Sequence, residues 1–282
     1  MNSLEIRGLT KTFGTKKALQ NVTFNVPENS IFGFIGANGA GKTTTMKMIL
    51  GLLSPDEGEV FVCGERVTFG ETKTNRLIGY LPDVPNFYGY MNPPEYLRLC
   101  GEISGLDADT IKKRSANLLE LVGLPGENRK IRGFSRGMKQ RLGMAQALIS
   151  EPKVLICDEP TSALDPLGRK EILDILQELR GKTTVVFSTH ILSDVERICD
   201  SIAFIHAGKI VLESTIADLK VKSAAQKITL EYENGVDPAE IVRVLTENNL
   251  APKSFETDEA DLEKLFLGHI TEDVKTKGGE VQ

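Results

Sequence analysis

The pattern of apolar and polar positions divides the chain into segments with different predicted structure. Up to about residue 90 the apolar runs are short, which predicts strands, and one segment, Thr43–Leu50, has the spacing of a helix. Ile31–Ile35 is apolar at nearly every position, which is typical of a strand buried on both faces. The strands predicted in this region are Leu4–Gly8, Val22–Val26, Ile31–Ile35, Glu59–Val62 and Leu77–Leu81.

Beyond residue 90 the spacing becomes helical and then alternates. Three consecutive helices are predicted at Pro93–Ile103, Thr110–Val122 and Ser135–Ile149. Strands and helices then follow in turn at Val154–Cys157, Gly168–Leu179, Thr184–Ser188, Ile191–Ile198 and Ser201–Ile205. This alternation around a helical insert predicts an α/β fold with a mostly parallel sheet.

A change in charge marks a candidate domain boundary near residue 222. Residues 223–282 contain 6 Lys and Arg against 13 Asp and Glu, whereas residues 1–222 contain 28 against 26. We therefore predict one large domain, 1–222, with a helical subdomain at about 88–150, and a small α+β region, 223–282, ending in a polar tail. Within the second region the pattern predicts a strand at 227–232, a helix at Pro238–Glu247 and a helix at 260–267.

Composition excludes several classes of protein. A net charge of −5, with 40% hydrophobic and 26% charged residues, argues against a disordered chain and against a strongly basic nucleic-acid binder. The longest apolar runs have the length of strands, and Met1–Lys11 does not resemble a signal peptide, so a cytosolic protein is expected. The four cysteines are widely spaced and are predicted to be reduced thiols in the core: Cys63, Cys100, Cys157 and Cys199.

The segment Gly36–Thr43 matches the phosphate-loop pattern GxxxxGK[ST] between a buried strand and a helix. Its glycines allow the backbone N–H groups to wrap around a polyphosphate, and Lys42 would reach the β- and γ-phosphates. The hydroxyl of Thr43 would bind Mg²⁺. The alternative is a glycine-rich turn that happens to contain a lysine, which the strand–loop–helix context disfavours.

A second motif ends the apolar strand that begins at Val154. Asp158 is placed to hold Mg²⁺, and the adjacent Glu159 suits the polarisation of a water that attacks the γ-phosphate. Taken alone, two acids after a strand are more often solvated turn residues. Downstream of a phosphate loop, the nucleotide-site interpretation is favoured.

A third motif, Phe134–Arg141, opens a helix with Ser135 at its N-cap. With these three motifs in this order, residues 1–220 resemble an ATP-binding cassette (ABC) ATPase, the nucleotide-binding subunit of an ABC transporter. Ser135 and Gly137 match the Ser and second Gly of the family signature LSGGQ, while Arg136 and Met138 depart from it in a way that looks like the bacterial drug and antibiotic export branch. The resemblance implies a P-loop core, an antiparallel β subdomain and an inserted helical subdomain.

Further roles are implied by the resemblance alone. Phe13 falls where an aromatic ring stacks on adenine, Ser162–Asp165 at the D-loop, and His190 at the switch histidine that contacts the γ-phosphate. Asp83 stands where the family usually has a Q-loop glutamine, and we expect it to keep a metal-sensing role with altered metal or pH dependence. The expected catalytic residues are Glu159, His190 and Asp83, and the expected metal ligands are Thr43, Asp158 and Asp83. The nucleotide is expected to contact Phe13, Gly36, Asn38, Gly39, Ala40, Gly41, Lys42, Thr43, Thr44, Ser135, Gly137 and Asp165.

The resemblance also implies partners. Two cassettes would bind two ATP molecules with Mg²⁺ head to tail, which requires a second ATPase subunit, with a homodimer favoured. A separate transmembrane permease would carry the transport path, which places this chain at the cytoplasmic face of the membrane as a peripheral subunit and implies no nucleic-acid partner. The aromatic stretch Tyr80–Tyr96 is interpreted as either a groove for the permease or ordinary core. Two alternatives remain: a soluble ABC-type ATPase and a non-hydrolytic nucleotide-dependent clamp. The last 60 residues are expected to form an accessory or dimer-supporting domain.

Overall fold

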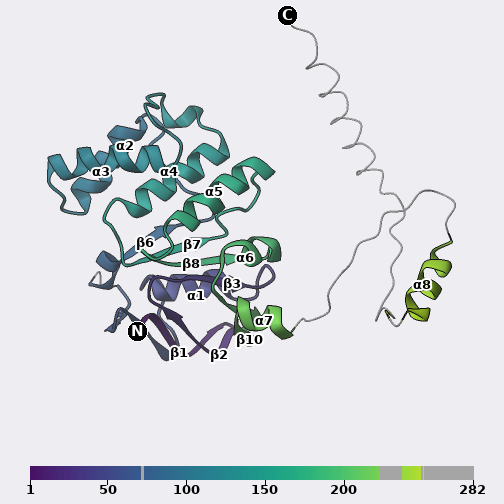
Figure 1. Cartoon of the computed structure of the whole chain (residues 1–282). Helices are drawn as coiled ribbons and strands as arrows, with labels where there is room; N and C mark the ends of the chain where they lie inside the picture. The colour runs from purple at the N-terminus through teal and green to yellow at the C-terminus, as the bar shows by residue number, and fades with distance from the viewer. Residues whose placement is uncertain (71–72, 223–236, 249, 251–282) are drawn as a thin grey trace, which may run out of the picture. The chain divides into compact units, whose positions relative to one another are not determined.

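The computed structural model describes residues 1–70, 73–222, 237–248 and 250 (Figure 1). The chain divides into two units, Met1–Ala224 and Ala225–Gln282, each of which is described by itself. The domain boundary expected from the change in charge stays a prediction.

A six-stranded sheet forms the centre of the first unit, in the order β10-β9-β3-β8-β7-β6. All neighbouring pairs are parallel except β10–β9, which confirms the predicted mostly parallel sheet. The bounds are Ile31–Ile35 (β3), Ile78–Leu81 (β6), Val154–Asp158 (β7), Thr184–Thr189 (β8), Ser201–His206 (β9) and Lys209–Thr215 (β10). Every residue of β3, β7 and β8 is buried, which agrees with their continuous apolar runs.

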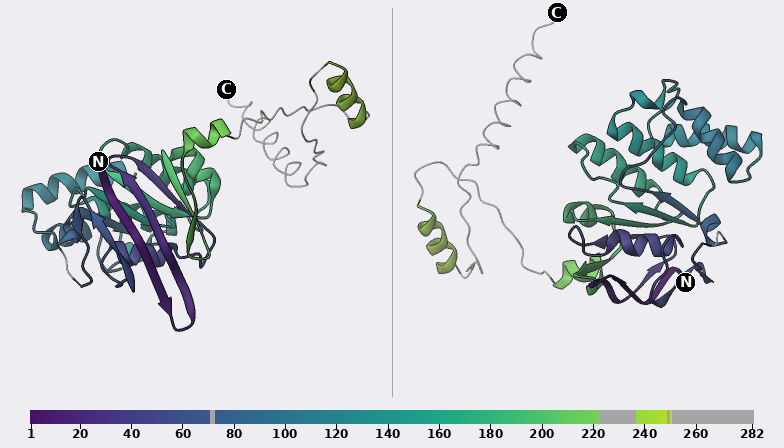
Figure 2. Two further views of the ribbon diagram at one scale, coloured as in Figure 1. Left: turned by 90° about the horizontal axis from the view of Figure 1, so that it is seen from below. Right: turned by 180° about the vertical axis from the view of Figure 1, so that it is seen from behind.

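A second, antiparallel sheet has the order β2-β1-β4-β5. Its bounds are Asn2–Phe13 (β1), Lys16–Pro27 (β2), Glu57–Val62 (β4) and Glu65–Arg66 (β5). The long hairpin of β1 and β2 is seen clearly in Figure 2. The sequence indicated only the alternating part of each long strand that lies away from the hairpin turn, because the residues near the turn are mostly polar. The two sheets share a core in which the ring of Phe24 stacks on those of Phe32 and Phe34, at 5.3 and 5.0 Å.

The three predicted helices of the insert are present, and they gather at one end of the first unit (Figure 1). They are α2 (Pro93–Ile103), α3 (Ala108–Leu121) and α4 (Arg136–Leu148). Asn92, Asp107 and Ser135 cap them by accepting hydrogen bonds from backbone N–H groups of the first turn. There are also two short 3-10 helices: Thr74–Leu77 directly precedes β6, and Ile131–Gly133 precedes α4.

The remaining helices lie beside the sheet, except for one in the second unit. They are α1 (Lys42–Ile49), α5 (Pro166–Glu178), α6 (Leu192–Ile198) and α7 (Ile216–Lys222), with α8 (Pro238–Glu247) in the second unit. The pattern missed β5, β10 and α7, which are short or largely exposed. It correctly predicted α8, while the predicted strand 227–232 and helix 260–267 lie outside the described residues. Within the described ranges, no helix is both long and apolar enough to cross a bilayer.

The prediction of four core thiols is wrong at one position. Cys157 and Cys199 are buried and Cys100 is half-buried, whereas Cys63 is exposed. Cys63 lies in the turn between β4 and β5 with a φ of 50°, so the chain reverses there at the surface instead of entering the core. All four thiols are free, as expected.

Candidate functional site

Four adjacent strands deliver the predicted site residues to one edge of the sheet. In the order β3, β8, β7 and β6, their carboxyl ends lead to the phosphate loop, to His190, to Asp158 and Glu159, and to Asp83. Because the strands are parallel and in register, with Asp158 opposite Ser188, these groups meet although they lie far apart in the sequence. Ligands of open α/β sheets bind at this edge.

The phosphate loop leaves β3 and enters α1 with backbone that only glycine adopts easily. Gly41, the N-cap of α1, has a φ of 119°, and a Cβ there would lie 2.6 Å from the side chain of Leu19. A Cβ on Gly36 would lie 2.5 Å from the carbonyl oxygen of Ile205. Asn38 and Gly39 in the loop are exposed, and so is Thr43 in the first turn of α1, so the middle of the loop and the start of the helix reach the solvent. This arrangement is suited to a polyphosphate anion.

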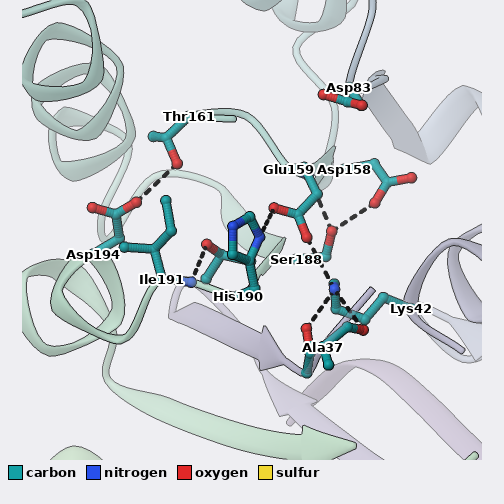
Figure 3. Close-up of polar contacts among 12 residues, drawn as sticks. Ala37, Lys42, Asp83, Asp158, Glu159, Thr161, Ser188, His190, Ile191 and Asp194 are labelled. Carbon is teal, nitrogen blue, oxygen red and sulfur yellow. Dashed lines mark hydrogen bonds and ion pairs between the residues drawn. The ribbon is translucent and has the colours of Figure 1, made fainter. Parts of the chain in front are cut away.

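Lys42 lies beneath this loop and is 5% exposed. Its Nζ donates hydrogen bonds to the carbonyl oxygens of Gly36 and Ala37, at 2.5 and 3.3 Å. The same ammonium forms an ion pair with Glu159 Oε1 at 2.9 Å (Figure 3). Lys42 is therefore held between the phosphate loop and a carboxylate at the end of the neighbouring strands.

Glu159 has contacts on both of its oxygens. His190 Nδ1 lies 2.9 Å from Glu159 Oε2, while Oε1 faces Lys42 (Figure 3). The backbone of Glu159 is left-handed, with a φ of 50°, which turns the chain sharply after β7. The structure therefore brings three predicted residues, Lys42, Glu159 and His190, into one chain of contacts.

Ser188 is a site residue that the sequence reasoning missed. Its hydroxyl donates a hydrogen bond of 2.6 Å to Asp158 Oδ1, and it accepts one of 3.0 Å from the backbone N–H of Glu159. Asp158 is almost completely buried, so its carboxylate needs such a partner. The available signal was a hydroxyl at the polar end of an otherwise apolar strand, which became informative only when β8 was known to pair with β7.

Two of the three residues that depart from the family pattern, Arg136 and Asp83, contact each other. Arg136 Nη2 lies 3.4 Å from Asp83 Oδ1, and both side chains are about half exposed. Burial raises the pKa of Asp83; the Arg136 guanidinium opposes this shift, while Asp158 and Glu159 add to it. Asp83 therefore lies within the electrostatic reach of the other two acids, and Arg136 faces Asp83 rather than solvent alone.

The other predicted residues lie outside this chain of contacts. Phe13 is half exposed at the end of β1, and Lys11 Nζ lies 5.8 Å from the centre of its ring. Ser135 accepts a hydrogen bond from Met138 N at the start of α4, and Asp165 accepts one from Gly168 N at the start of α5. Thr43 is exposed and Thr44 partly buried at the start of α1.

The oxygen donors at this edge suit a hard divalent cation. Mg²⁺ usually takes one or two carboxylates together with the phosphate oxygens of a substrate. Asp158 supplies the buried carboxylate, and Thr43 supplies an exposed hydroxyl at the start of α1. No three His, Cys, Asp or Glu side chains of the described residues are grouped as a metal centre by themselves.

This fold and this edge define a P-loop nucleotide-binding domain. A family model described as ABC transporter matches residues 19–162, and the chain belongs to the ABC transporter family as an ATP-binding subunit. The resemblance seen in the sequence is thereby confirmed, and the ATPase activity characteristic of such subunits is assigned to this chain. ATP-binding subunits of ABC transporters work with transmembrane permease components.

Three similar proteins illustrate the relationship. YxlF of Bacillus subtilis (strain 168), an uncharacterized ABC transporter ATP-binding protein, is 43% identical over 83% of this chain and 78% of its own. The bacitracin transport ATP-binding protein BcrA of Bacillus licheniformis is 41% identical over 76% of this chain and 70% of its own. A solved ATP-binding cassette, dimeric in a post-hydrolysis state with ADP and Pi, is 26% identical, with a TM-score of 0.69 over 76% of this chain and 98% of its own.

Proposed function

We propose that this chain hydrolyses ATP to power the export of a substrate through a separate membrane subunit. The observation that carries the proposal is the chain of contacts from Lys42 through Glu159 to His190 at the carboxyl ends of the parallel strands. Export is supported by the similarity to the bacitracin transport protein BcrA and by the departures Arg136 and Met138 in the signature segment.

The contacts support distinct roles for three residues. A γ-phosphate bound in the loop would compete with Glu159 for the ammonium of Lys42. Glu159, released from Lys42, would accept the proton of the attacking water. His190, which already contacts Glu159, would orient that carboxylate and contact the γ-phosphate.

The remaining predicted residues are proposed to hold the nucleotide and its metal. Thr43 and Asp158 would hold Mg²⁺, which neutralises phosphate charge when bound, and Asp83 would sense it from the edge of the site. Phe13 would stack on the adenine. The loop contacts are proposed for Gly36, Asn38, Gly39, Ala40, Gly41, Lys42 and Thr44.

We further propose that the site is completed by a second copy of the chain. Ser135 and Gly137 lie outside the contacts around Lys42, so they are available to a nucleotide that is held by a partner subunit. Asp165, at the start of α5, would lie beside that nucleotide. The solved cassette with ADP and Pi is dimeric, which supports this arrangement. Residues 223–282 are proposed to be an accessory domain that supports the dimer.

The segment before α2 is proposed to receive the permease at the cytoplasmic face of the membrane. Tyr88 and Tyr90 are 55% and 67% exposed, with ring centres 5.9 Å apart. Phe87 instead packs edge-on against Tyr96 at 5.0 Å and belongs to the core of the insert. The two tyrosines are thus the aromatic groups available to a partner, while Phe87 fits the core interpretation.

Two experiments test the proposal against its alternatives. Glu159→Gln should abolish phosphate release while ATP still binds, whereas a non-hydrolytic clamp would show no kinetic change. Glu65→Gln is the matched control, because Glu65 pairs with Lys73 at the surface, at 2.6 Å. Affinity purification from detergent-solubilised membranes should recover a polytopic partner in stoichiometric amount. Recovery from the soluble fraction alone, or with ribosomes, would favour the soluble ATPase.

A further inference from the structure

Asp194 is a buried carboxylate that none of the roles above uses. It lies in the first turn of α6, four residues after His190, and is 1% exposed. Each of its oxygens has one partner. Thr161 Oγ1 donates to Oδ2 at 2.8 Å, and Arg169 Nε donates to Oδ1 at 2.6 Å (Figure 3 shows the first). A buried carboxylate is retained only with such partners, so the contact is specific.

The two donors bracket the turn that follows Glu159. Thr161 stands immediately before Ser162–Asp165, and Arg169 lies in α5 immediately after it. Arg169 also donates from Nη2 to Ser193 Oγ at 2.8 Å, beside Asp194. The turn is thus tied at both ends to the start of α6.

The contacts close a ring between two loops. The segment after β7 runs from Glu159 to Thr161, and the segment after β8 runs from His190 into the first turn of α6, where Asp194 lies. The loops are linked at one end by His190 and Glu159, at 2.9 Å, and at the other by Thr161 and Asp194. The first link faces the site, while the second is buried, with Thr161 almost completely enclosed.

We propose that Asp194, through Thr161, is a positioning residue that fixes His190 against Glu159. The inference rests on the function proposed for His190 and Glu159. Two loops that are linked at the buried end have less freedom at the exposed end, so the imidazole stays oriented while the nucleotide changes. Loss of the hydrogen bond between Thr161 and Asp194 would leave ATP binding intact, but His190 would be held less firmly against Glu159.

Thr161→Val is the sharpest test, because it removes the hydroxyl and keeps the β-branched shape. We expect kcat to fall roughly 10-fold while KM for ATP changes less than about 2-fold, since the displaced group acts in the reaction and not in binding. Thr161→Ser, which keeps a hydroxyl, should restore kcat. The matched control is Thr184→Val at the opposite end of β8, where the buried Thr184 hydroxyl bonds Ser3 Oγ at 2.8 Å and accepts from Asn29 N at 2.9 Å. It should leave kcat per folded molecule unchanged.

A double-mutant cycle separates positioning from a general structural effect. In single-turnover assays, Thr161→Val should add nothing to His190→Ala if Thr161 acts through His190. Equal losses of kcat in Thr161→Val and Thr184→Val, or full additivity with His190→Ala, would overturn the inference alone. Wild-type turnover in His190→Ala would instead overturn the role proposed for His190, and the inference with it. Asp194→Asn leaves one acceptor oxygen for two donors, so it should also lower kcat, and wild-type kcat in this variant would contradict the role of Asp194.

Discussion

Replacing Glu159 by Gln should tighten ATP binding in addition to stopping hydrolysis. Lys42 Nζ lies 2.9 Å from Glu159 Oε1, and the two side chains are 5% and 12% exposed. A γ-phosphate that binds Lys42 has to replace this contact, so the ion pair opposes the nucleotide. Gln keeps an acceptor at the same position but removes its charge, which weakens the competition without emptying the space.

The contact at Glu159 Oε1 is an ion pair without the geometry of a hydrogen bond, so the difference between charged and neutral polar contacts is a guide to its magnitude. A bond to a charged group contributes about 1.5–3 kcal/mol net, and a neutral one about 0.5–1.5 kcal/mol. The difference of about 1–1.5 kcal/mol corresponds to a Kd for ATP that is about 5- to 12-fold lower in the variant. Repulsion between Glu159 and the phosphates has the same sign and adds to the effect.

The assay is an equilibrium titration with ATP and with ADP at a protein concentration where light scattering shows a monomer. Dimerisation around ATP would itself lower the apparent Kd, so the monomer has to be maintained. ADP lacks the γ-phosphate, and its affinity should rise less than that of ATP. Glu65→Gln should change neither value. Unchanged or weaker ATP binding by the monomeric Glu159→Gln variant would refute the competition for Lys42.

Three further predictions follow from the structure. The raised pKa of Asp83 means that the folded state favours the protonated carboxyl. The stability that this protonated form contributes is lost as the pH rises through the raised pKa. Asp83→Asn should therefore have a higher Tm than the wild type at pH 7, and the two Tm values should be equal below the ordinary pKa of 3.8. A higher Tm of Asp83→Asn that persists in acid would contradict this pH dependence. For the metal-sensing role the test is Asp83→Gln, and an unchanged Mg²⁺ dependence of its turnover would exclude that role. The double variant Tyr88→Ala/Tyr90→Ala should weaken co-purification of the permease and leave ATP binding unchanged. Phe69→Ala, at another exposed aromatic residue, should change neither property. Loss of both properties in the double variant would favour a core role for the tyrosines. A thiol reagent should modify Cys63 first and Cys157 only on unfolding, as followed by mass spectrometry, and equal rates would contradict the burial of Cys157.

Local sequence patterns were sufficient to predict the strands that bury continuous apolar runs and the helices that begin at strong N-cap residues. The helices α2, α3 and α4 lie within a few residues of their predicted bounds, because Asn92, Asp107 and Ser135 are good N-cap residues before amphipathic segments. The exposed strand β10 was missed because its side chains give no buried face to detect. Cys63 was placed in the core on residue type alone, and only its left-handed turn conformation put it at the surface.

The phosphate loop and the acids after β7 could be predicted from the sequence because each is a run of residues adjacent along the chain, and the order of such motifs indicated the class of protein. Which strands are neighbours became known only from the folded chain, since strand pairing joins distant segments and no local pattern encodes it. The order β3, β8, β7 and β6 brings Lys42, Glu159 and His190 together and sets Ser188 between the two acids. It also closes the buried link of Thr161 to Asp194, which joins residues 33 positions apart. Such contacts form only when two loops leave parallel strands at the same edge of one sheet.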